Sequence, residues 1–280
     1  GVPSMIQTAL ASMGQWNKII CISPQLKSLL DLEISEDLSV FIPNGIEPVG
    51  WVERDYEKII RILYVGRIED SQKGIFLLPK IIASLKQIRT DFKLVIIGNG
   101  PSMSDLKRMI VDYNIADRVC LRSSLPHDQV IQAMKENHFL IMPSYYEGMP
   151  IVILEAMSSG LIPIASKLHG HTDMLVKEGI TGFYGLPGNA DSFVAAIVKA
   201  IQDRSKLKQV SKNASDLVMD QYNLQEISEQ YLELFKATTV VKHRNNKIDF
   251  SILPDYPHFP LVLTKVIRKF IRLLNLSTVK

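Results

Sequence analysis

Short apolar runs alternate with helix-length amphipathic segments along most of this 280-residue chain. This alternation is typical of βαβ units, in which helices connect parallel strands and cover both faces of the sheet. Strands are expected at residues 59–65, 93–97, 118–121, 139–142 and 161–165, with helices between them at 75–88, 104–113, 128–136 and 150–158. The pattern therefore predicts an α/β fold with a Rossmann-like, doubly wound parallel sheet.

The segments on either side of this stretch are less regular. A last short strand is expected near residues 182–185, and helices at 191–203, 206–219 and 224–235 would flank the sheet. Ahead of residue 59 stand an apolar run at 19–22, a helix start at Pro24, a second apolar run at 39–42 and the turn Pro43-Asn44-Gly45. Asn-Gly accepts positive φ and marks a tight turn.

Composition excludes several classes of protein. With 46% hydrophobic residues, 22% charged residues and a mean hydropathy of +0.10, the chain is neither disordered nor fibrous. No apolar run approaches the roughly 18 to 20 residues of a membrane-spanning helix, so an integral membrane protein is not expected. Cys21 and Cys120 stand in separate strand-like segments, and we interpret them as buried apolar residues in a reducing cytoplasm.

Charge is divided unevenly along the chain. The first 235 residues carry 23 basic and 27 acidic side chains, which argues against binding to nucleic acid. Residues 236–280 form a basic tail with nine Lys or Arg against two Asp, a net charge of +7. Between residues 263 and 274, apolar side chains recur at helical spacing, with basic side chains on the opposite face. This amphipathic helix would either pack on a neighbouring domain or rest as a peripheral anchor on an anionic membrane surface at the inner face.

Two glycine turns follow the first two expected strands of the sheet. After 59–65, Gly66 would let the backbone approach a ligand, and Arg67 and Lys73 supply two cations suited to two phosphates. A surface loop with two solvated cations is the alternative. The second turn, Gly98-Asn99-Gly100-Pro101, is a weaker signal, and no G-x-G-x-x-G occurs, which weighs against a nicotinamide or flavin cofactor.

The loop at residues 143–150 is the most informative turn. Pro150 suits the first position of a helix, so the N–H groups of Gly148 and Met149 would face an anion above the helix N-terminus. Glu147 lies in the loop, and Glu155 interrupts an apolar helical stretch. A carboxylate in such surroundings needs a partner, either a structural one or a pair of ligand hydroxyls.

Together these motifs resemble the retaining GT-B glycosyltransferases of the group 1 type (family 4). The central match is Glu147-x7-Glu155 with Gly-x-Pro after the first glutamate, and the resemblance covers roughly residues 16–235. The other motifs agree in order and spacing: Ile42-Pro43-Asn44-Gly45-Ile46-Glu47, Val65-Gly66-Arg67 with Lys73-Gly74, Ile97-Gly98-Asn99-Gly100-Pro101, Ala156-Met157-Ser158-Ser159-Gly160-Leu161-Ile162-Pro163 and Thr181-Gly182.

The resemblance implies a hexosyl-type transferase that moves a sugar from a nucleoside diphosphate to a glycan or lipid-linked acceptor in polysaccharide or glycoconjugate biosynthesis. It implies that Arg67 and Lys73, beside Gly66, bind the donor diphosphate. Glu155 would bind the ribose hydroxyls, and the backbone near Leu125 would contact the base.

The resemblance further implies that Glu147, with the amides of Gly148 and Met149, holds the donor sugar and its phosphate. This makes Glu147 the candidate catalytic residue. Two cations neutralise a departing diphosphate as charge develops on it. No Asp-x-Asp occurs in the chain, so no metal and no cofactor is expected besides the UDP- or GDP-sugar substrate.

The chain departs from the family's pattern at three positions. Ser123 stands where the family usually has Gly, His138 where it has Asp, and Asp173 where it has Glu. Because Ser123 is near the expected base site, the identity of the base stays open. The histidines at 127, 138, 169 and 171 are interpreted as satisfied polar groups rather than as acid–base catalysts.

A GT-B enzyme has two Rossmann-like domains, and the resemblance covers the second. Residues 1–22 are interpreted as the remnant of a largely absent N-terminal domain, 23–235 as the nucleotide-sugar-binding domain and 236–280 as the basic tail. Transfer would then need a partner N-terminal domain or a longer chain. The alternatives are a non-catalytic nucleotide-sugar-binding subunit and, with less support from the motif order, a sugar-nucleotide epimerase.

Overall fold

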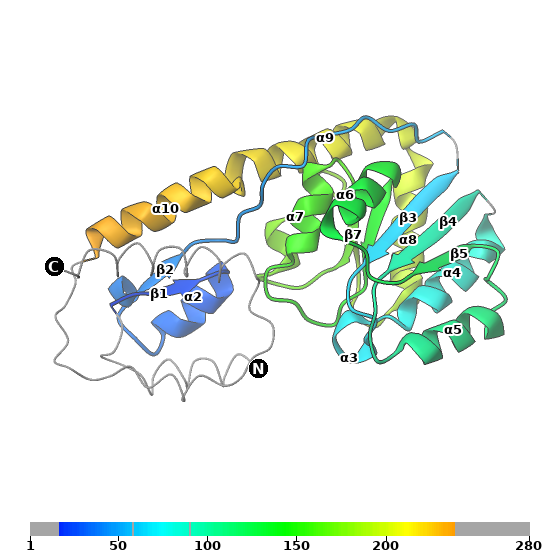
Figure 1. Cartoon of the computed structure of the whole chain (residues 1–280), viewed down its shortest axis with the longest axis horizontal. Coiled ribbons are helices and arrows are strands. Elements are labelled where there is room, and N and C mark those ends of the chain that lie inside the picture. The colour runs from blue at the N-terminus through cyan, green and yellow to red at the C-terminus, as the bar shows by residue number, and fades with distance from the viewer. Residues whose placement is uncertain (1–16, 58, 90, 239–280) are drawn as a thin grey trace. The chain divides into compact units, whose positions relative to one another are not determined.

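The computed structural model describes residues 17–57, 59–89 and 91–238 and shows a six-stranded parallel sheet (Figure 1). Its strand order, β5-β4-β3-β6-β7-β8, means that the chain runs from β3 to one edge, returns to pair β6 with β3, and continues to the other edge. The predicted doubly wound α/β fold is confirmed. The strands are β3 (Ile60–Val65), β4 (Phe92–Ile97), β5 (Val119–Arg122), β6 (Phe139–Met142), β7 (Ile162–Ser166) and β8 (Phe183–Gly185).

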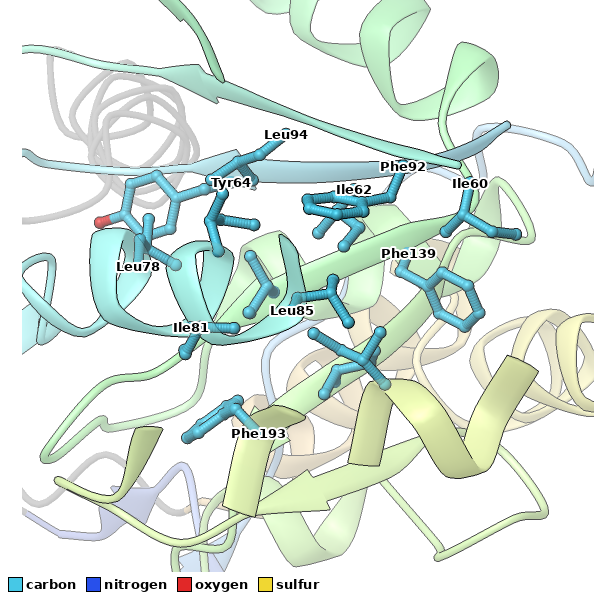
Figure 2. Packing of buried hydrophobic residues seen from close by; sticks show 14 of the residues in the cluster. Ile60, Ile62, Tyr64, Leu78, Ile81, Leu85, Phe92, Leu94, Phe139 and Phe193 are labelled. Atoms are coloured by element: carbon cyan, nitrogen blue, oxygen red, sulfur yellow. The ribbon is translucent and has the colours of Figure 1, made fainter. Parts of the chain in front are cut away.

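Alternate side chains of the central strand enter two cores, one on each face of the sheet. Ile62 and Tyr64 of β3 belong to a cluster that includes residues of α4 and α8 (Figure 2), whereas Leu63 belongs to a cluster with α6 and α7. Because successive strand residues point to opposite faces, a sheet covered on both faces needs unbroken apolar runs. The helices are α4 (Leu77–Ile88), α5 (Met103–Asp112), α6 (His127–Glu136), α7 (Ile151–Ser158), α8 (Ala190–Gln202), α9 (Arg204–Gln221) and α10 (Leu224–Ala237).

Two local expectations from the sequence are wrong. The helix expected from residue 75 begins at Leu77, and a separate one-turn helix, α3 (Asp70–Lys73), precedes it and ends at Gly74 with φ +59°. Cys21 is buried as expected, but Cys120 is exposed. Its strand, β5, is an edge of the sheet, where alternate side chains face solvent.

A smaller parallel pair precedes the main sheet in the chain. β1 (Ile19–Cys21) pairs with β2 (Ser39–Phe41), and α2 (Pro24–Asp31) and the 3₁₀ turn η1 (Glu36–Leu38) connect them. Ser23 caps α2 by accepting the Leu26 N–H. The domain boundaries after residues 22 and 235 stay predictions.

The basic tail and its expected amphipathic helix lie outside the described residues, apart from the end of α10. Within residues 17–238, none of the helices combines the length and the apolar character needed to cross a membrane.

His138, which stands where the resemblance expects Asp, immediately precedes β6 and is fully buried. Its Nδ1 accepts the backbone N–H of Arg61 at 3.1 Å, and the Arg61 guanidinium lies 3.3 Å from Nε2. Burial, followed by the positive charges of Arg61 and Arg54, lowers the pKa of His138 to about 4. The folded protein therefore holds this ring neutral.

This buried histidine is expected to make the fold sensitive to acid. The pKa of His138 is lower in the folded than in the unfolded state, so its contribution to the free energy of unfolding is fully present above about pH 6.5. As the pH falls towards 4 this contribution is lost, and the free energy of unfolding decreases by up to about 3 kcal/mol. Urea unfolding between pH 7 and pH 4.5 should show a shallower pH dependence for His138→Asn than for the wild type. Replacement of the exposed His169 by Asn serves as the control, and equal slopes for His138→Asn and wild type would contradict the expectation.

Candidate functional site

The candidate site lies where β3 and β6 end side by side. The turn after β3 carries Gly66 and Arg67, and the loop after β6 spans residues 143–150. From these neighbouring strands the chain continues towards opposite edges of the sheet, to β4 and to β7, so their carboxyl ends form a topological switch point. Ligands of open α/β sheets bind at such a switch point.

Backbone packing explains the glycines of the first two turns. The Gly66 N–H donates to the Ile97 carbonyl at 3.1 Å, which joins the turn after β3 to the end of β4. A Cβ at Gly98 would lie 1.9 Å from the Gly66 carbonyl oxygen, and one at Gly100 would lie 2.2 Å from the Ile68 oxygen. The second glycine turn is thus required for contact between the two turns.

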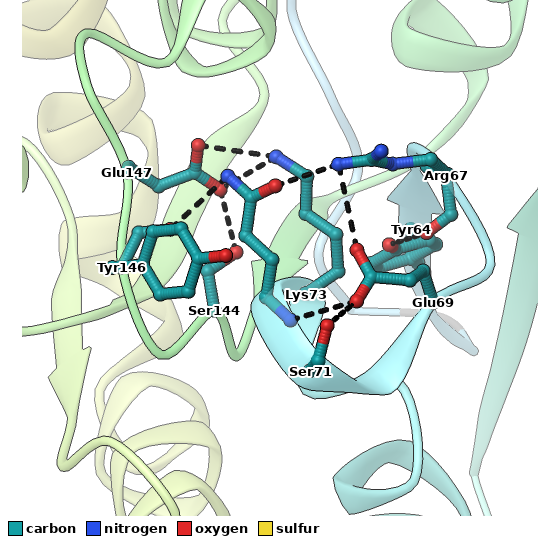
Figure 3. A network of polar contacts seen from close by, with 9 residues as sticks. Tyr64, Arg67, Glu69, Ser71, Lys73, Ser144, Tyr146 and Glu147 are labelled. Carbon is teal, nitrogen blue, oxygen red and sulfur yellow. Dashed lines mark hydrogen bonds and ion pairs between the residues drawn. The ribbon is translucent and has the colours of Figure 1, made fainter. Parts of the chain in front are cut away.

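Arg67, on the turn after β3, contacts α3 and its N-cap residue (Figure 3). Its Nη2 donates to Gln72 Oε1 at 2.6 Å and lies 3.4 Å from Glu69 Oε2, while its side chain stays about half exposed, at 45%. Tyr64 from β3 donates its hydroxyl to the Arg67 carbonyl at 2.8 Å. Burial first, and then the Glu147 and Glu69 carboxylates, raise the pKa of Tyr64, which keeps this hydroxyl protonated as a donor.

Lys73 and Glu147, expected from sequence to act on different parts of a ligand, form an ion pair (Figure 3). Lys73 Nζ lies 2.8 and 3.1 Å from the two carboxylate oxygens of Glu147, and Ser144 donates to Oε1 at 2.6 Å. The Glu147 side chain is only 7% exposed. A carboxylate this buried requires a charged partner, and Lys73 supplies it.

Two backbone contacts bring this pair together. The Tyr145 N–H donates to the Gln72 carbonyl at 2.8 Å. At Gly74, a Cβ would lie 2.3 Å from the Pro143 carbonyl oxygen, and its φ of +59° also favours glycine. The end of α3 therefore lies directly against the loop that carries Glu147.

The loop leads into the N-terminus of α7, one residue later than expected. Pro150 is the N-cap and Ile151 the first helical residue. The Met149 side chain is buried, with its sulfur accepting the Asn44 N–H, and the Gly148 carbonyl accepts Nδ1–H of His171 at 2.9 Å. Gly148 and Met149 therefore lie just ahead of the N-cap, and the binding of an anion by their backbone N–H groups stays a prediction.

Glu155 projects from the middle of α7 and contacts a residue that sequence analysis set aside. Its Oε1 lies 2.8 Å from Nε2 of His127, the first residue of α6. Leu125, two residues earlier, is partly buried against the cluster beneath α6 and α7. Within the described residues, no hydrogen bond or ion pair joins Glu155 to Arg67, Lys73 or Glu147.

Sequence analysis also missed Glu69 and Gln72. Glu69 caps α3 by accepting the Gln72 N–H and also accepts the Ser71 hydroxyl. A one-turn helix gives no periodic signal, so this cap could not be recognised beforehand. No group of three or more His, Cys, Asp or Glu that could hold a metal occurs in the part of the chain that the structure describes.

The chain matches known glycosyltransferases in sequence and fold. The sequence profile of the family described as "Glycosyl transferases group 1" matches residues 51–217. Alpha-D-kanosaminyltransferase of Streptomyces kanamyceticus is 27% identical over 62% of this chain and 45% of its own length. The phosphatidylinositol N-acetylglucosaminyltransferase GPI3 subunit of Saccharomyces cerevisiae is 26% identical over 82% of this chain and 53% of its own length.

Among solved structures, Anabaena HepE in complex with UDP and glucose superposes with a TM-score of 0.73 at 19% identity, covering 83% of this chain and 67% of HepE. The six-stranded domain thus has the Rossmann-like fold of GT-B proteins. The chain spans about half the length of the curated relatives it matches first.

Proposed function

The chain belongs to the glycosyl transferases group 1 family, and we propose that its six-stranded domain binds the nucleoside-diphosphate-sugar donor of a retaining, family 4 type hexosyltransferase. The observation that carries this proposal is the Lys73–Glu147 pair at the switch point, with Arg67 on the adjoining turn. Two cations and a buried carboxylate thus lie near the carboxyl ends of β3 and β6, where the proposal has the diphosphate bind. HepE, of the same fold, was solved with UDP and glucose, which supports a UDP-sugar as the donor of this chain. A GDP-sugar is the alternative donor.

The proposed chemistry follows from the charges. Arg67, with its forked donors, and Lys73, with three N–H groups, bind the two phosphates and stabilise the negative charge that grows on the leaving diphosphate. Arg67 and Lys73 supply this stabilisation in the proposal, so no divalent metal is required. Glu147 shares Lys73 with the diphosphate and orients the donor sugar, together with the amides of Gly148 and Met149.

In this proposal the acceptor binds a second domain. That domain is another part of the same protein or a partner protein. The names of two relatives include a lipid: phosphatidylinositol for the yeast protein and a diphosphoundecaprenol derivative for the Escherichia coli protein. We therefore propose a glycan or lipid-linked acceptor and a cytoplasmic, membrane-peripheral location.

The two glutamates are expected to have separable effects on binding. Glu155→Ala should weaken UDP and UDP-glucose alike, by about tenfold or more, because ribose is common to both and a hydrogen bond to a charged group contributes about 1.5 to 3 kcal/mol. Glu147→Gln should preserve or strengthen UDP binding, since it frees Lys73, and weaken only the sugar conjugate. Calorimetric titrations with UDP, UDP-glucose, GDP and GDP-mannose measure both effects.

The exposed Glu229 of α10 offers a matched control, and Glu229→Ala should bind every ligand as the wild type does. If both site variants stay folded and lose affinity for UDP equally, the glutamates have structural roles. The assignments of Glu155 to the ribose and of Glu147 to the donor sugar then both fail.

A further inference from the structure

His127 and Glu155 bring together two elements on the α6–α7 side of the sheet. His127 is the first residue of α6, and Glu155 lies 28 residues later, near the middle of α7. The two helices contact each other and lie adjacent in Figure 1. The 2.8 Å contact between Nε2 and Oε1 is therefore a bond between helices rather than a local turn contact.

The surroundings of Glu155 make this bond important for the carboxylate's orientation. Its side chain is 18% exposed and is flanked along α7 by the buried Leu154 and Ala156. In the described part of the chain, His127 supplies the one hydrogen bond to this carboxylate, through Oε1. Without that bond the terminal torsion of a glutamate is broad, so the carboxylate could rotate among several orientations. With it, the carboxylate has a preferred orientation, in which Oε2 remains able to accept.

The segment before α6 restricts the backbone that leads into His127, whose side chain is 73% exposed. Pro126 occupies the N-cap position without a capping hydrogen bond, and its ring restricts φ, which here is −54°. The preceding Leu125 packs against the buried cluster under α6 and α7. One short segment therefore carries both the residue assigned to the base and the residue that contacts the glutamate assigned to the ribose.

We propose that His127 is a positioning residue for the nucleoside: it holds Oε1 of Glu155 so that Oε2 is aimed at a ribose hydroxyl. This inference rests on the proposed function, because it takes Glu155 as the ribose contact. His127 itself need not touch the ligand. Its contribution is the fixed orientation of a carboxylate, which lowers the entropy lost when ribose binds.

A competing explanation is that His127 only screens the charge of Glu155. In that case its removal would change the affinity for every nucleotide by the same factor, whatever its sugar. A positioning role makes a different prediction, because only nucleotides with ribose hydroxyls can use the fixed oxygen. The ratio of affinities for a ribonucleotide and its dideoxy counterpart separates the two explanations.

The experiment measures dissociation constants of the 280-residue chain for UDP and 2′,3′-dideoxy-UDP, and for GDP and 2′,3′-dideoxy-GDP. For whichever of UDP and GDP binds more strongly, the wild type is expected to bind the ribose form about tenfold or more tightly than the dideoxy form. His127→Ala should reduce that preference at least about threefold, through weaker binding of the ribose form alone. His127→Gln, which keeps an N–H donor near the Nε2 position, should restore most of it. Gln129→Ala, an exposed change on the same helix, should leave it unchanged.

The outcomes separate this inference from the function on which it rests. If Glu155→Ala removes the ribose preference while His127→Ala keeps it, or if His127→Ala weakens both sugar forms equally, the positioning role is overturned and the ribose contact stands. If Glu155→Ala keeps the preference, the ribose contact and the positioning role both fail. If the wild type binds none of the four nucleotides, the proposed function fails and His127 loses its role with it.

Discussion

Replacement of Arg54 by Met should destabilise the fold by about 3 to 5 kcal/mol, the largest effect that we expect from a single substitution outside the candidate site, because several hydrogen bonds from a charged group are lost together. The Arg54 side chain is partly buried, and this burial lowers its pKa to about 10. Nε donates to the Asn137 carbonyl at 2.5 Å, Nη1 to the Ser159 carbonyl at 2.9 Å, and Nη2 to the Met134 carbonyl at 2.9 Å. These carbonyls lie at or just beyond the C-terminal ends of α6 and α7, where a cation is favourable.

Met fills a similar volume but removes the guanidinium donors, so that the Asn137 and Met134 carbonyls lose their Arg54 hydrogen bonds and the Ser159 carbonyl keeps only the Val52 N–H. Urea unfolding at pH 7 measures the loss, and the exposed Arg108→Met, expected to change stability by less than about 0.5 kcal/mol, is the control. A loss below about 1 kcal/mol for Arg54→Met would show that water replaces the guanidinium at the helix ends. The same two helices carry His127 and Glu155, so Arg54 also stabilises the elements that bear the proposed nucleoside contacts.

The second large effect concerns the Lys73–Glu147 ion pair of the candidate site. Lys73→Ala is expected to weaken the binding of UDP or GDP by about 10- to 150-fold, because it removes the proposed charged hydrogen bond to the diphosphate. It also leaves the Glu147 carboxylate, 7% exposed, without its cation and facing the ligand's negative charge. Adding Glu147→Gln to Lys73→Ala should therefore recover part of the lost affinity.

Calorimetry of the two single variants and the double variant completes this cycle. The exposed Lys80→Ala of α4 is the matched control. A double variant that binds no better than Lys73→Ala would place Glu147 away from the diphosphate, and wild-type affinity in Lys73→Ala would remove that lysine from the site.

The periodicity of the sequence predicts the sheet well, because burial on both faces forces unbroken apolar runs. The expected strand at 59–65 differs from β3 (Ile60–Val65) by one residue, and the expected helix at 128–136 differs equally from α6. Where burial is one-sided or local, the prediction fails. Cys120 is exposed on the edge strand, and α3 is too short for a helical period.

The members of the candidate site could be named from motifs, but most of their contacts could not. Lys73 and Glu147 are 74 residues apart, and their pairing depends on the close approach of Gly74 to Pro143. His127 carries no motif, and only the packing of α6 on α7 brings it to Glu155. Arg54 contacts backbone carbonyls, which leave no signal in the sequence of its partners.

The central claim is that this chain binds a nucleoside diphosphate at the β3–β6 switch point without a metal. Isothermal titration of the chain with UDP and with GDP, in buffer containing EDTA, tests it most directly. We predict saturable binding of at least one of the two at a single site, weakened about tenfold or more in Arg67→Ala and unchanged in Lys80→Ala. Absence of binding to both nucleotides, binding that requires added Mg²⁺, or wild-type affinity in both Arg67→Ala and Lys73→Ala would contradict it.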